Sequence, residues 1–430
     1  MVRVQLINPL TKTDSKYFVV EPSLGLLSIG SYIRSKDSSI EVEILDGQIV
    51  SREYIEERIG ENAAVVGISA NVMNYSPELA TIAKNRGAMV VFGGCYPSRH
   101  YTPIINNQPS VDAVVVGEGE EPFLKIVNGW PLDKIAGVFY KGATNRTNTY
   151  SANITELPMM DWNLVDLRAY HERSDLKTGS LQAPIYISKG CRWRAGSKGC
   201  KICSIFDKEY KIKNPKRFWD EVKTMYNLGI RHIRDESDDI PPLDWLKTAL
   251  VMRPHGLEDL TFYGYASTRN LNEETLDLLS KLGYVRFFTG LESGDDTILK
   301  NIHKGTTRAK NLETVKRMTN KGISIVGSWI LGNEGETDKS LQNTLDHATE
   351  IAAIGNVDVY LTNLIVPLPG SDVFRKLNKS QGNKYDHQDE LSIPSMHKEW
   401  IENFCDVDID TIKSYQKKIM ELSPIKAKMS

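Results

Sequence analysis

Short apolar runs alternate with amphipathic stretches along most of this chain of 430 residues. Up to about residue 140, runs rich in β-branched residues alternate with helical patterns at the spacing of βαβ units. Strands are expected at 4–7, 42–45, 64–69, 88–94 and 111–116, with helices over 25–33, 54–59 and 77–86. This alternation predicts a parallel, doubly wound sheet over residues 1–140.

The ends of these predicted strands carry small and polar residues. A doubly wound sheet binds ligands at the carboxyl ends of its strands, and glycines there let a bulky ligand approach the backbone. The first strand is not followed by G-x-G-x-x-G, which argues against a dinucleotide. A second interpretation, that these glycines only make βα turns, stays open. The strand ends read Asp46-Gly47, Ser69-Ala70-Asn71, Gly93-Gly94 and Gly117-Glu118-Gly119.

The pattern weakens over residues 141–183, where we expect a crossing segment or linker between two domains. Alternation resumes over 184–375, with strands expected near 185–188, 231–234, 260–265, 285–288, 324–331 and 357–366. Six βα steps are enough for a partial (β/α)6 barrel of the TIM type. Residues 376–430 are expected to form a short, polar C-terminal tail that ends in a helix over 411–422.

Three of the five cysteines lie in one loop at the start of this second domain, as Cys191, Cys200 and Cys203 in the spacing C-x8-C-x2-C. Iron prefers soft thiolate ligands, and three thiolates can hold a cubane through three of its four irons. The fourth iron is then open to a substrate or cofactor. Four cations of the loop are expected to favour the thiolate form: Arg192, Arg194, Lys198 and Lys201.

Other interpretations of the cysteine loop stay open at this point. A zinc site normally takes four protein ligands, and His232 could complete a Cys3His set. A disulfide is disfavoured because nothing marks the chain as exported and one cysteine would remain unpaired. Inert buried cysteines are common singly but seldom occur three together in a loop of glycines and lysines.

Polar residues also gather where the predicted barrel strands end, which is the catalytic face of a βα barrel. For single members such as Arg269 or Glu292, an ion pair at the barrel mouth without a functional role is the alternative. The clusters are Asp235-Glu236-Ser237-Asp238-Asp239, Ser267-Thr268-Arg269-Asn270, Gly290-Leu291-Glu292-Ser293-Gly294, Gly332-Asn333-Glu334-Gly335 and Pro367-Leu368-Pro369-Gly370.

Composition changes this picture little. The net charge of −2, with 40% hydrophobic and 25% charged residues, is typical of a soluble globular protein and creates no field that attracts nucleic acid or membranes. The first residues lack the apolar region of a signal peptide, and no apolar run approaches the ~20 residues of a membrane-spanning helix. We therefore expect a cytoplasmic protein, in a compartment where thiols stay reduced.

The ordered motifs from residue 1 to about 375 resemble those of the cobalamin-dependent radical S-adenosylmethionine (radical SAM) enzymes. No single motif decides this, but the ordered set is highly specific. The N-terminal motifs are Pro22-x-Leu24-Gly25-Leu26, Gly67-Ile68-Ser69, Gly93-Gly94 and Gly117-Glu118-Gly119-Glu120-x-Pro122-Phe123. Those of the second domain are Arg269, Gly290-Leu291-Glu292-Ser293-Gly294, Ile302-x-Lys304-Gly305, Gly332-x-x-Gly335-Glu336-Thr337 and Pro367-Leu368-Pro369-Gly370-Ser371.

The resemblance implies three cofactors and the residues that hold them. Cys191, Cys200 and Cys203 would bind a [4Fe–4S] cluster whose open iron chelates S-adenosylmethionine. The positions that match S-adenosylmethionine contacts are Glu236 and Ser237 for the amino group, Arg269 for the carboxylate, and Glu292 and Ser293 near the ribose and methionine. Cobalamin would lie against the Rossmann-like N-terminal domain at Ser69, Ala70, Asn71, Gly93, Gly94, Gly117, Glu118 and Gly119.

The chain departs from the family pattern in three places. The usual cysteine spacing is C-x3-C-x2-C, so this loop holds five additional residues between its first two cysteines. Ile202 occupies the position before the last cysteine, which is usually aromatic, and Trp193 could supply the missing ring. No D-x-H-x-x-G occurs in the N-terminal domain, so bound cobalamin would lack a histidine axial ligand.

The activity implied by the resemblance is reductive cleavage of S-adenosylmethionine, with methyl transfer to an unactivated carbon of a small molecule or peptide. An external one-electron reductant such as flavodoxin or ferredoxin would be the partner, with no nucleic acid or membrane involved. The same cofactors could instead serve a cyclisation, rearrangement or oxidation, with cobalamin as an electron carrier or absent. A non-catalytic cobalamin- or zinc-binding protein is the alternative from another class.

Overall fold

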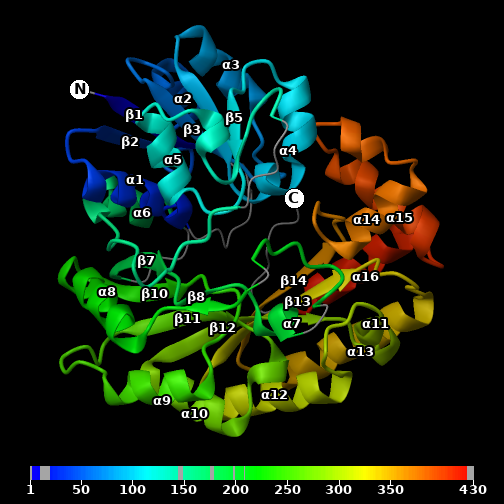
Figure 1. Ribbon diagram of the computed structural model, residues 1–430. Helices are drawn as coiled ribbons and strands as arrows, with labels where there is room; N and C mark the ends of the chain where they lie inside the picture. The colour runs from blue at the N-terminus through cyan, green and yellow to red at the C-terminus, as the bar shows by residue number, and fades with distance from the viewer. Residues whose placement is uncertain are drawn as a thin grey trace. The chain divides into compact units, whose positions relative to one another are not determined.

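The computed structural model describes residues 2–9, 20–143, 149–174, 179–196, 199–207 and 209–423. The chain forms two compact units (Figure 1). The first contains Phe18–Leu181, the strand that precedes them, and Asn378–Leu391, whereas the second contains Gln182–Leu377 and the chain from Ser392 onward. Within the described residues, none of the helices combines the length and the apolar character that crossing a bilayer requires.

A six-stranded sheet forms the centre of the first unit, in the order β2-β1-β3-β4-β5-β6. Strands β1 to β5 are parallel and β6 is antiparallel to β5. The strands are β1 (Arg3–Asn8), β2 (Glu41–Asp46), β3 (Val65–Ser69), β4 (Met89–Gly93), β5 (Ala113–Val115) and β6 (Val138–Phe139). The predicted doubly wound sheet is therefore confirmed, with the switch point at which such folds bind ligands between β1 and β3.

The helices of the first unit bury apolar faces against this sheet. They are α1 (Leu24–Lys36), α2 (Arg52–Arg58), α3 (Pro77–Asn85), α4 (Cys95–Asn107) and α5 (Glu120–Val127). Phe123 of α5 packs so closely on β3 that a Cβ on Gly67 would lie 2.7 Å from its ring. The sequence pattern did not predict α4, which contains Pro103 and has non-helical dihedral angles at His100. Such a kink breaks the helical periodicity that makes a helix recognisable.

The predicted crossing segment packs on the first unit where the structure describes it. It contains α6 (Leu167–Arg173), and the hydroxyl of Tyr170 donates to the buried carboxylate of Asp46 over 2.8 Å. Farther back along the segment, Asp161 N donates to Ser31 Oγ over 2.7 Å. These buried hydrogen bonds attach the segment to the β2 end and to α1.

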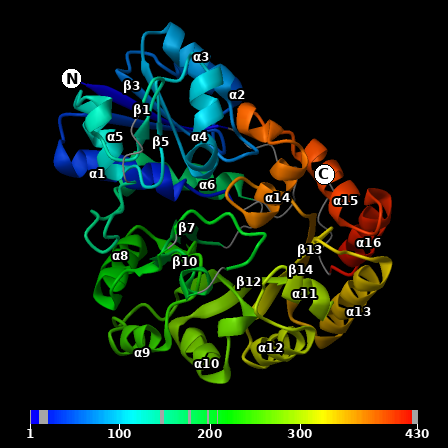
Figure 2. The same ribbon diagram turned by 45° about the vertical axis from the view of Figure 1, so that its right-hand side comes forward.

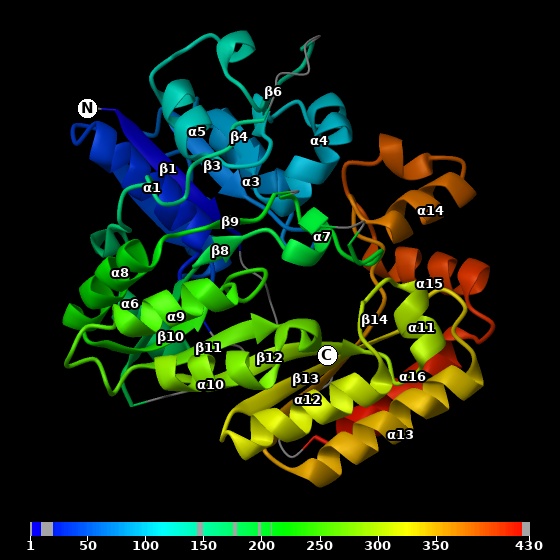
Figure 3. The same cartoon turned by 60° about the horizontal axis from the view of Figure 1, so that its bottom comes forward.

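The second unit contains a second six-stranded sheet, in the order β14-β13-β12-β11-β10-β7, with parallel pairing from β10 to β14. Its strands are β7 (Leu181–Ile185), β10 (Ile230–Asp235), β11 (Thr261–Ala266), β12 (Tyr284–Glu292), β13 (Ser324–Leu331) and β14 (Val357–Leu364). Helices α9 (Leu243–Val251), α10 (Glu273–Leu282), α12 (Arg308–Asn320) and α13 (Asp338–Ile354) lie along one face (Figure 3). These are the six βα steps of the predicted partial barrel.

Three helices follow the last strand, of which the sequence predicted only the last. They are α14 (Asp372–Ser380), α15 (Ile393–Phe404) and α16 (Ile409–Glu421). Helix α16 packs on the edge strand β14 and on α13 (Figure 2). Gln416 Nε2 of α16 donates to Thr362 O over 2.6 Å, and the buried Trp400 of α15 donates its indole N–H to Gly332 O over 2.8 Å. The C-terminal helices therefore belong to the core of the second unit.

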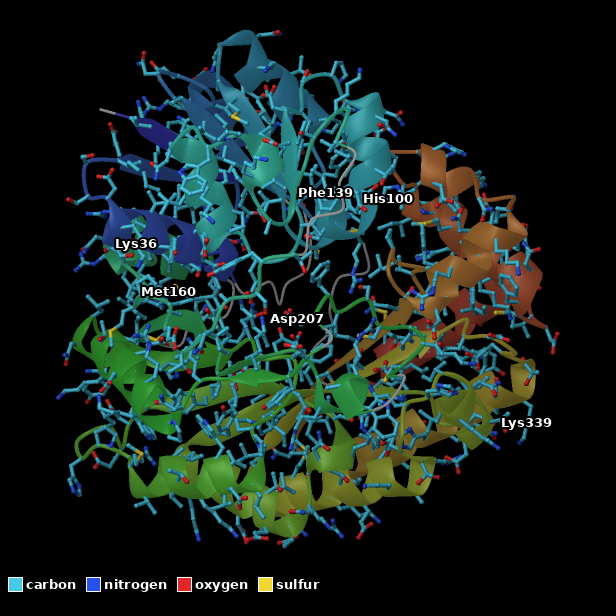
Figure 4. All side chains as sticks on the ribbon, in the orientation of Figure 1. Lys36, His100, Phe139, Met160, Asp207 and Lys339 are labelled. Carbon is cyan, nitrogen blue, oxygen red and sulfur yellow. The ribbon has the colours of Figure 1, made fainter. Side chains whose placement is uncertain are left out.

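The segment between α14 and α15 packs on α4 of the first unit. His100 Nε2 lies 2.5 Å from Gln388 O, and the Tyr96 hydroxyl donates to Asp389 O over 2.6 Å. His100 is labelled in Figure 4. Tyr75 also reaches this segment, because its hydroxyl lies 3.4 Å from Asp389 Oδ2. This packing explains why residues 378–391 form part of the first unit although they follow the barrel strands in sequence.

A buried carboxyl group at the start of α13 gives the stability of the chain a specific pH dependence. Glu336 Oε2 accepts hydrogen bonds from the backbone N–H groups of Gly332 and Asn333 over 3.2 and 3.3 Å, and Oε1 lies 2.5 Å from Ser340 Oγ. Burial nevertheless raises the pKa of Glu336 to about 7. The neutral carboxyl group therefore stabilises the fold below the unfolded pKa, and this contribution is lost as the pH rises through the folded pKa.

We expect the unfolding free energy of the wild type, relative to Glu336→Gln, to fall by up to ~3 kcal/mol between about pH 4.5 and pH 8. The amide of glutamine keeps the size of the side chain and does not titrate in this range. Denaturant unfolding of the two proteins at a series of pH values measures the difference. Two curves that run parallel across this range would contradict the account.

Candidate functional site

The cysteine loop follows β8 (Ser188–Lys189) and is attached to the carboxylates that follow β10. Gly190 N donates to Asp238 Oδ2 over 2.7 Å, and the backbone N and Nε of Arg192 donate to Asp239 Oδ2 over 3.2 and 3.1 Å. Gly190 has a φ of +79°, and a Cβ there would lie 2.1 Å from Glu209 O. Only glycine fits this position, so the start of the loop is fixed by its backbone.

A short helix and a turn bring the three cysteines together. In α7 (Arg192–Gly196), Ala195 N donates to Cys191 O over 2.9 Å, and Cys203 N donates to Cys200 O over 3.1 Å. The three thiols interact electrostatically: Cys191 raises the pKa of Cys203, and Cys203 raises the pKa of Cys200. For both thiols, burial is the largest cause of the raised pKa.

The cations near these thiols come largely from outside the loop. Lys304 and Arg269 oppose the effect of burial and lower the pKa of the Cys200 thiol. Arg194 does the same for Cys203, whose carbonyl oxygen accepts a hydrogen bond from Arg194 Nη1 over 3.1 Å. The expectation that cations of the loop face the thiols is thus confirmed for Arg194.

For the other loop cations the outcome differs. Arg192 pairs with Asp239 instead, over 3.1 Å, and Lys198 lies outside the described residues. Lys201 bonds through its backbone N–H to Ile302 O over 3.0 Å. The composition of the loop could not identify Lys304 as a neighbour of Cys200, because that lysine follows another strand of the sheet.

A buried ion pair lies beside Cys200. Lys304 Nζ is 2.6 Å from Glu292 Oε1, and the two side chains are 11% and 9% exposed. Glu292 ends β12 with a φ of +62°, which is uncommon for a residue other than glycine. A Cβ on Gly290 would lie 2.4 Å from Glu292 Oε1 and 2.9 Å from Lys304 Nζ. The glycine of this motif therefore makes room for the ion pair.

Arg269 and Trp193 pack on each other at the same edge. The guanidinium of Arg269 lies 4.8 Å from the centre of the Trp193 ring, and its Nη1 donates to Lys304 O. Trp193 Nε1 donates to His303 O over 2.9 Å. An adjacent cavity of about 630 Å³ is lined by Trp193, Gly199, Asp296, Leu299, Lys300, His303, Gly305, Thr306 and Thr307. The aromatic ring that the sequence suggested as a substitute for the residue before Cys203 is thus part of the site.

The remaining predicted S-adenosylmethionine residues lie at the ends of neighbouring strands. Glu236 and Ser237 follow β10, Arg269 lies in η3 (Thr268–Asn270) after β11, and Ser293 follows β12. Figure 3 shows these strands side by side in the sheet. The predicted residues therefore share one edge of the sheet, as expected from parallel strands.

Several of these side chains have partners within the protein. The buried Ser237 Oγ lies 2.5 Å from Asp235 Oδ1 and accepts the backbone N–H groups of Ile187 and Ser188 over 2.8 and 2.9 Å. Ser293 Oγ lies 3.1 Å from Thr344 Oγ1. Glu236 pairs with Arg234.

The donor set of the loop suits an iron–sulfur cluster. His232, the residue that could complete a Cys3His zinc site, has its Nδ1 2.7 Å from Thr261 Oγ1 on β11. Across the described part of the chain, no three His, Cys, Asp or Glu side chains are arranged around one metal ion. In a cubane each thiolate binds a different iron, so the ligands of a cluster stand farther apart than those of a single ion. Three thiols of one loop, with Arg194, Arg269 and Lys304 as nearby cations, suit the preference of iron for soft ligands.

The glycines at the carboxyl edge of the first unit differ in what surrounds them. Gly94 has a φ of +99°, and a Cβ there would lie 2.7 Å from Ala70 O. Gly119 is similarly closed, since a Cβ would lie 2.8 Å from Ile29 Cδ1. At Gly93, in contrast, a Cβ would have Val115 O as its nearest neighbour among the described residues, at 4.0 Å. Packing within the protein accounts for Gly94 and Gly119, but the open space at Gly93 is of the kind that a ligand can fill.

The other predicted cobalamin residues shape the loops at this edge. Asn71 Oδ1 accepts the backbone N–H groups of Met73 and Asn74 over 2.7 and 3.2 Å, which folds the loop after Ser69 and Ala70. Gly117 N donates to Ser98 Oγ over 3.0 Å. Glu118 is buried and accepts the N–H group of Ala152. The structure thus brings the three loops after β3, β4 and β5 to one edge of the sheet.

Comparisons with known proteins match each part of the chain. Residues 15–127 match the B12 binding domain family, and residues 185–348 match the radical SAM superfamily. The chain is 26% identical to an uncharacterized methyltransferase of Pyrococcus horikoshii, PH0819, over 86% of this chain and 82% of that protein. It is 23% identical to the anaerobic magnesium-protoporphyrin IX monomethyl ester cyclase of Synechocystis, over 80% of this chain and 72% of the relative.

A solved structure has the same fold. The radical S-adenosylmethionine methyltransferase TsrM from Kitasatospora setae, with cobalamin and a [4Fe–4S] cluster bound, superimposes with a TM-score of 0.66 at 17% identity. The match covers 88% of this chain and 76% of TsrM. Together, the two matched domains and the cysteine loop assign a [4Fe–4S] cluster, S-adenosylmethionine and cobalamin as cofactors. The chain is therefore a radical SAM enzyme with a B12-binding domain.

Proposed function

We propose that this enzyme transfers a methyl group from S-adenosylmethionine, by way of cobalamin, to an unactivated carbon of a small molecule or peptide. A flavodoxin or ferredoxin supplies the electron. The observation that carries the proposal is the gathering of three thiols, three cations and a buried carboxylate at one strand edge of the radical SAM unit. Methyltransferases among the relatives, such as PH0819, support the choice of reaction.

The chain's own residues have distinct tasks in this proposal. Cys191, Cys200 and Cys203 hold the cluster, which when bound supplies the electron for cleaving S-adenosylmethionine, while bound cobalamin supplies the methyl group. Arg269 offers a guanidinium, the group best suited to bind a carboxylate. Glu292 offers a carboxylate that can accept hydrogen bonds from ribose hydroxyls.

The serines of the predicted site act by shaping the loops around the nucleoside. Ser237 binds two backbone N–H groups of the segment that leads to the cysteine loop. Ser293 Oγ accepts the N–H group of Asp295 over 3.1 Å and so fixes the turn after Glu292. We assign the carboxylate of Glu236, another residue of the predicted site, to the amino group of S-adenosylmethionine. An ammonium ion there would compete with Arg234 for the carboxylate.

In the first unit, we assign the edge formed by Ser69, Ala70, Asn71, Gly93 and Gly94, with the Gly117-Glu118-Gly119 loop, to cobalamin. His100 is the one histidine between residues 1 and 140, and it bonds to Gln388 O. This packing supports a cobalamin that binds without a histidine axial ligand. The open space at Gly93 supports close approach of the corrin to the backbone.

A second candidate is a radical reaction without methyl transfer, which the similarity to the Synechocystis cyclase favours. The two candidates differ in their products from S-adenosylmethionine. To distinguish the candidates, the reconstituted enzyme is incubated anaerobically with dithionite and S-adenosylmethionine, and the products are separated by chromatography. Methyl transfer requires S-adenosylhomocysteine together with 5′-deoxyadenosine, whereas a non-methylating enzyme gives 5′-deoxyadenosine alone. The absence of both products would contradict either radical function.

Replacing Cys191, Cys200 or Cys203 with serine should abolish the cluster. A serine hydroxyl is a poor ligand for iron compared with a thiolate. We expect each variant to lose the broad visible absorption of the cluster and at least about 90% of 5′-deoxyadenosine formation. Cys95→Ser and Cys405→Ser serve as matched controls and should keep both. Normal iron content in any variant of the three would show that its cysteine is not a ligand.

Alanine substitution at the two adjacent glycines should separate ligand binding from folding. Gly94→Ala should destabilise the first unit by about 1–3 kcal/mol, because its positive φ and the nearby Ala70 carbonyl leave no room for a methyl group. Gly93→Ala should change stability by less than about 0.5 kcal/mol yet lower the amount of hydroxocobalamin retained after desalting. Full retention by a stable Gly93→Ala protein would argue against a corrin at this edge.

A further inference from the structure

Lys304 contacts two parts of the site that the proposed function assigns to different cofactors. Its Nζ lies 2.6 Å from Glu292 Oε1, and its loop bonds to the cysteine loop, because Ile302 O accepts the N–H group of Lys201 over 3.0 Å. Lys304 stands in the loop after α11 (Asp296–Asn301), whereas Glu292 ends β12 and Cys200 belongs to the cysteine loop. Three separate segments therefore meet at one ammonium group.

Burial of this ion pair costs free energy, so stability alone does not explain its presence. Burying a charged pair costs desolvation energy that apolar side chains of similar volume would not incur. The surroundings are nevertheless adapted to it, because Gly290 leaves space for both charged groups and Glu292 adopts a positive φ. Removing the lysine alone would leave Glu292 as an uncompensated buried carboxylate.

The lysine also anchors the loops around it through its backbone. Its carbonyl oxygen accepts a hydrogen bond from Arg269, and the adjacent Gly305 packs against Arg269 and Trp193. Lys201 N, next to Cys200, donates to Ile302 O two residues before Lys304. The ammonium group is thus held at a fixed place relative to Cys200, Glu292 and Arg269.

We propose that Lys304 is a positioning residue that orients the Glu292 carboxylate for S-adenosylmethionine and stabilises the extra electron of the cluster bound at Cys200. The proposal rests on the proposed function, since it assumes a cluster on the three cysteines. A fixed positive charge favours the more negative of two redox states, and its effect is strong where water is excluded. Loss of Lys304 should therefore make the cluster harder to reduce.

The two members of the pair should have opposite effects on the cluster. Glu292 and Lys304 carry opposite charges and form one buried ion pair, with Nζ 2.6 Å from Oε1, so that either substitution leaves the other charge uncompensated. Lys304→Met should shift the midpoint potential of the cluster to more negative values, and Glu292→Gln should shift it to less negative values. A change that only loosened the structure would not produce shifts of opposite sign.

The test uses the full-length enzyme, reconstituted with iron and sulfide under anaerobic conditions. A redox titration followed by electron paramagnetic resonance gives the midpoint potential without S-adenosylmethionine, and equilibrium dialysis gives the affinity for S-adenosylmethionine. The variants are Lys304→Met, Lys304→Arg and Glu292→Gln. Lys316→Met serves as the matched control, because it removes an exposed lysine from α12, away from the cavity of the site.

We expect Lys304→Met to bind S-adenosylmethionine at least about tenfold more weakly, as is typical when a buried charge loses its partner. Lys304→Arg should restore the potential, and Lys316→Met should match the wild type in both measurements. The proposal is overturned if loaded Lys304→Met and Glu292→Gln keep the wild-type potential or shift it in the same direction. If Lys304→Met fails to load, the Glu292→Gln potential alone decides. A wild-type protein that binds no cluster would instead contradict the proposed function.

Discussion

The position of the candidate site depends on one buried carboxylate, that of Asp239. One of its oxygens accepts the backbone N and Nε of Arg192, and the other accepts Asn270 Nδ2 over 2.8 Å. Asp239 thereby joins three loops: the cysteine loop, the loop after β10 and the loop after β11. The carboxylate is nearly inaccessible, so its hydrogen bonds are strong and its charge must be met by donors. The geometry of the three thiols relative to Arg269 follows from this junction.

The arrangement of parallel strands determines where the candidate site lies in each of the two units. Parallel strands bring the ends of distant segments to one edge, and each unit places its small or charged residues there. In the radical SAM unit the edge is filled with buried charges that compensate one another, such as Glu292 and Lys304. In the B12-binding unit the edge carries glycines, of which Gly93 has its nearest described neighbour 4.0 Å from a Cβ. These differences agree with the two kinds of cofactor, since a cluster needs thiolates and counter-charges whereas a corrin needs space beside the backbone.

The features that sequence could predict are those encoded locally. Alternating apolar runs identified β1 to β5 and β10 to β14, whereas the short β6 was not predicted and β7 lies earlier than the strand expected at 185–188. The spacing of Cys191, Cys200 and Cys203 predicts a ligand loop. The cations around Cys200 illustrate what could not be predicted. Lys304 follows a different strand and comes near Cys200 only in the folded chain. Helix α4 was missed because Pro103 and the kink at His100 interrupt its pattern. The return of residues 378–391 to the first unit depends on single hydrogen bonds, such as that of Tyr96 to Asp389 O, which leave no periodic signal.

The central claim is that one chain binds a cluster in its second unit and cobalamin in its first. The most direct measurement is the iron, sulfide and corrinoid content of the full-length protein after anaerobic reconstitution with hydroxocobalamin and removal of unbound cofactors. The account predicts about four irons, about four sulfides and about one corrinoid per chain, with both cofactors visible in the absorption spectrum. A protein that retains zinc in place of iron, or a cluster with no corrinoid, would contradict it.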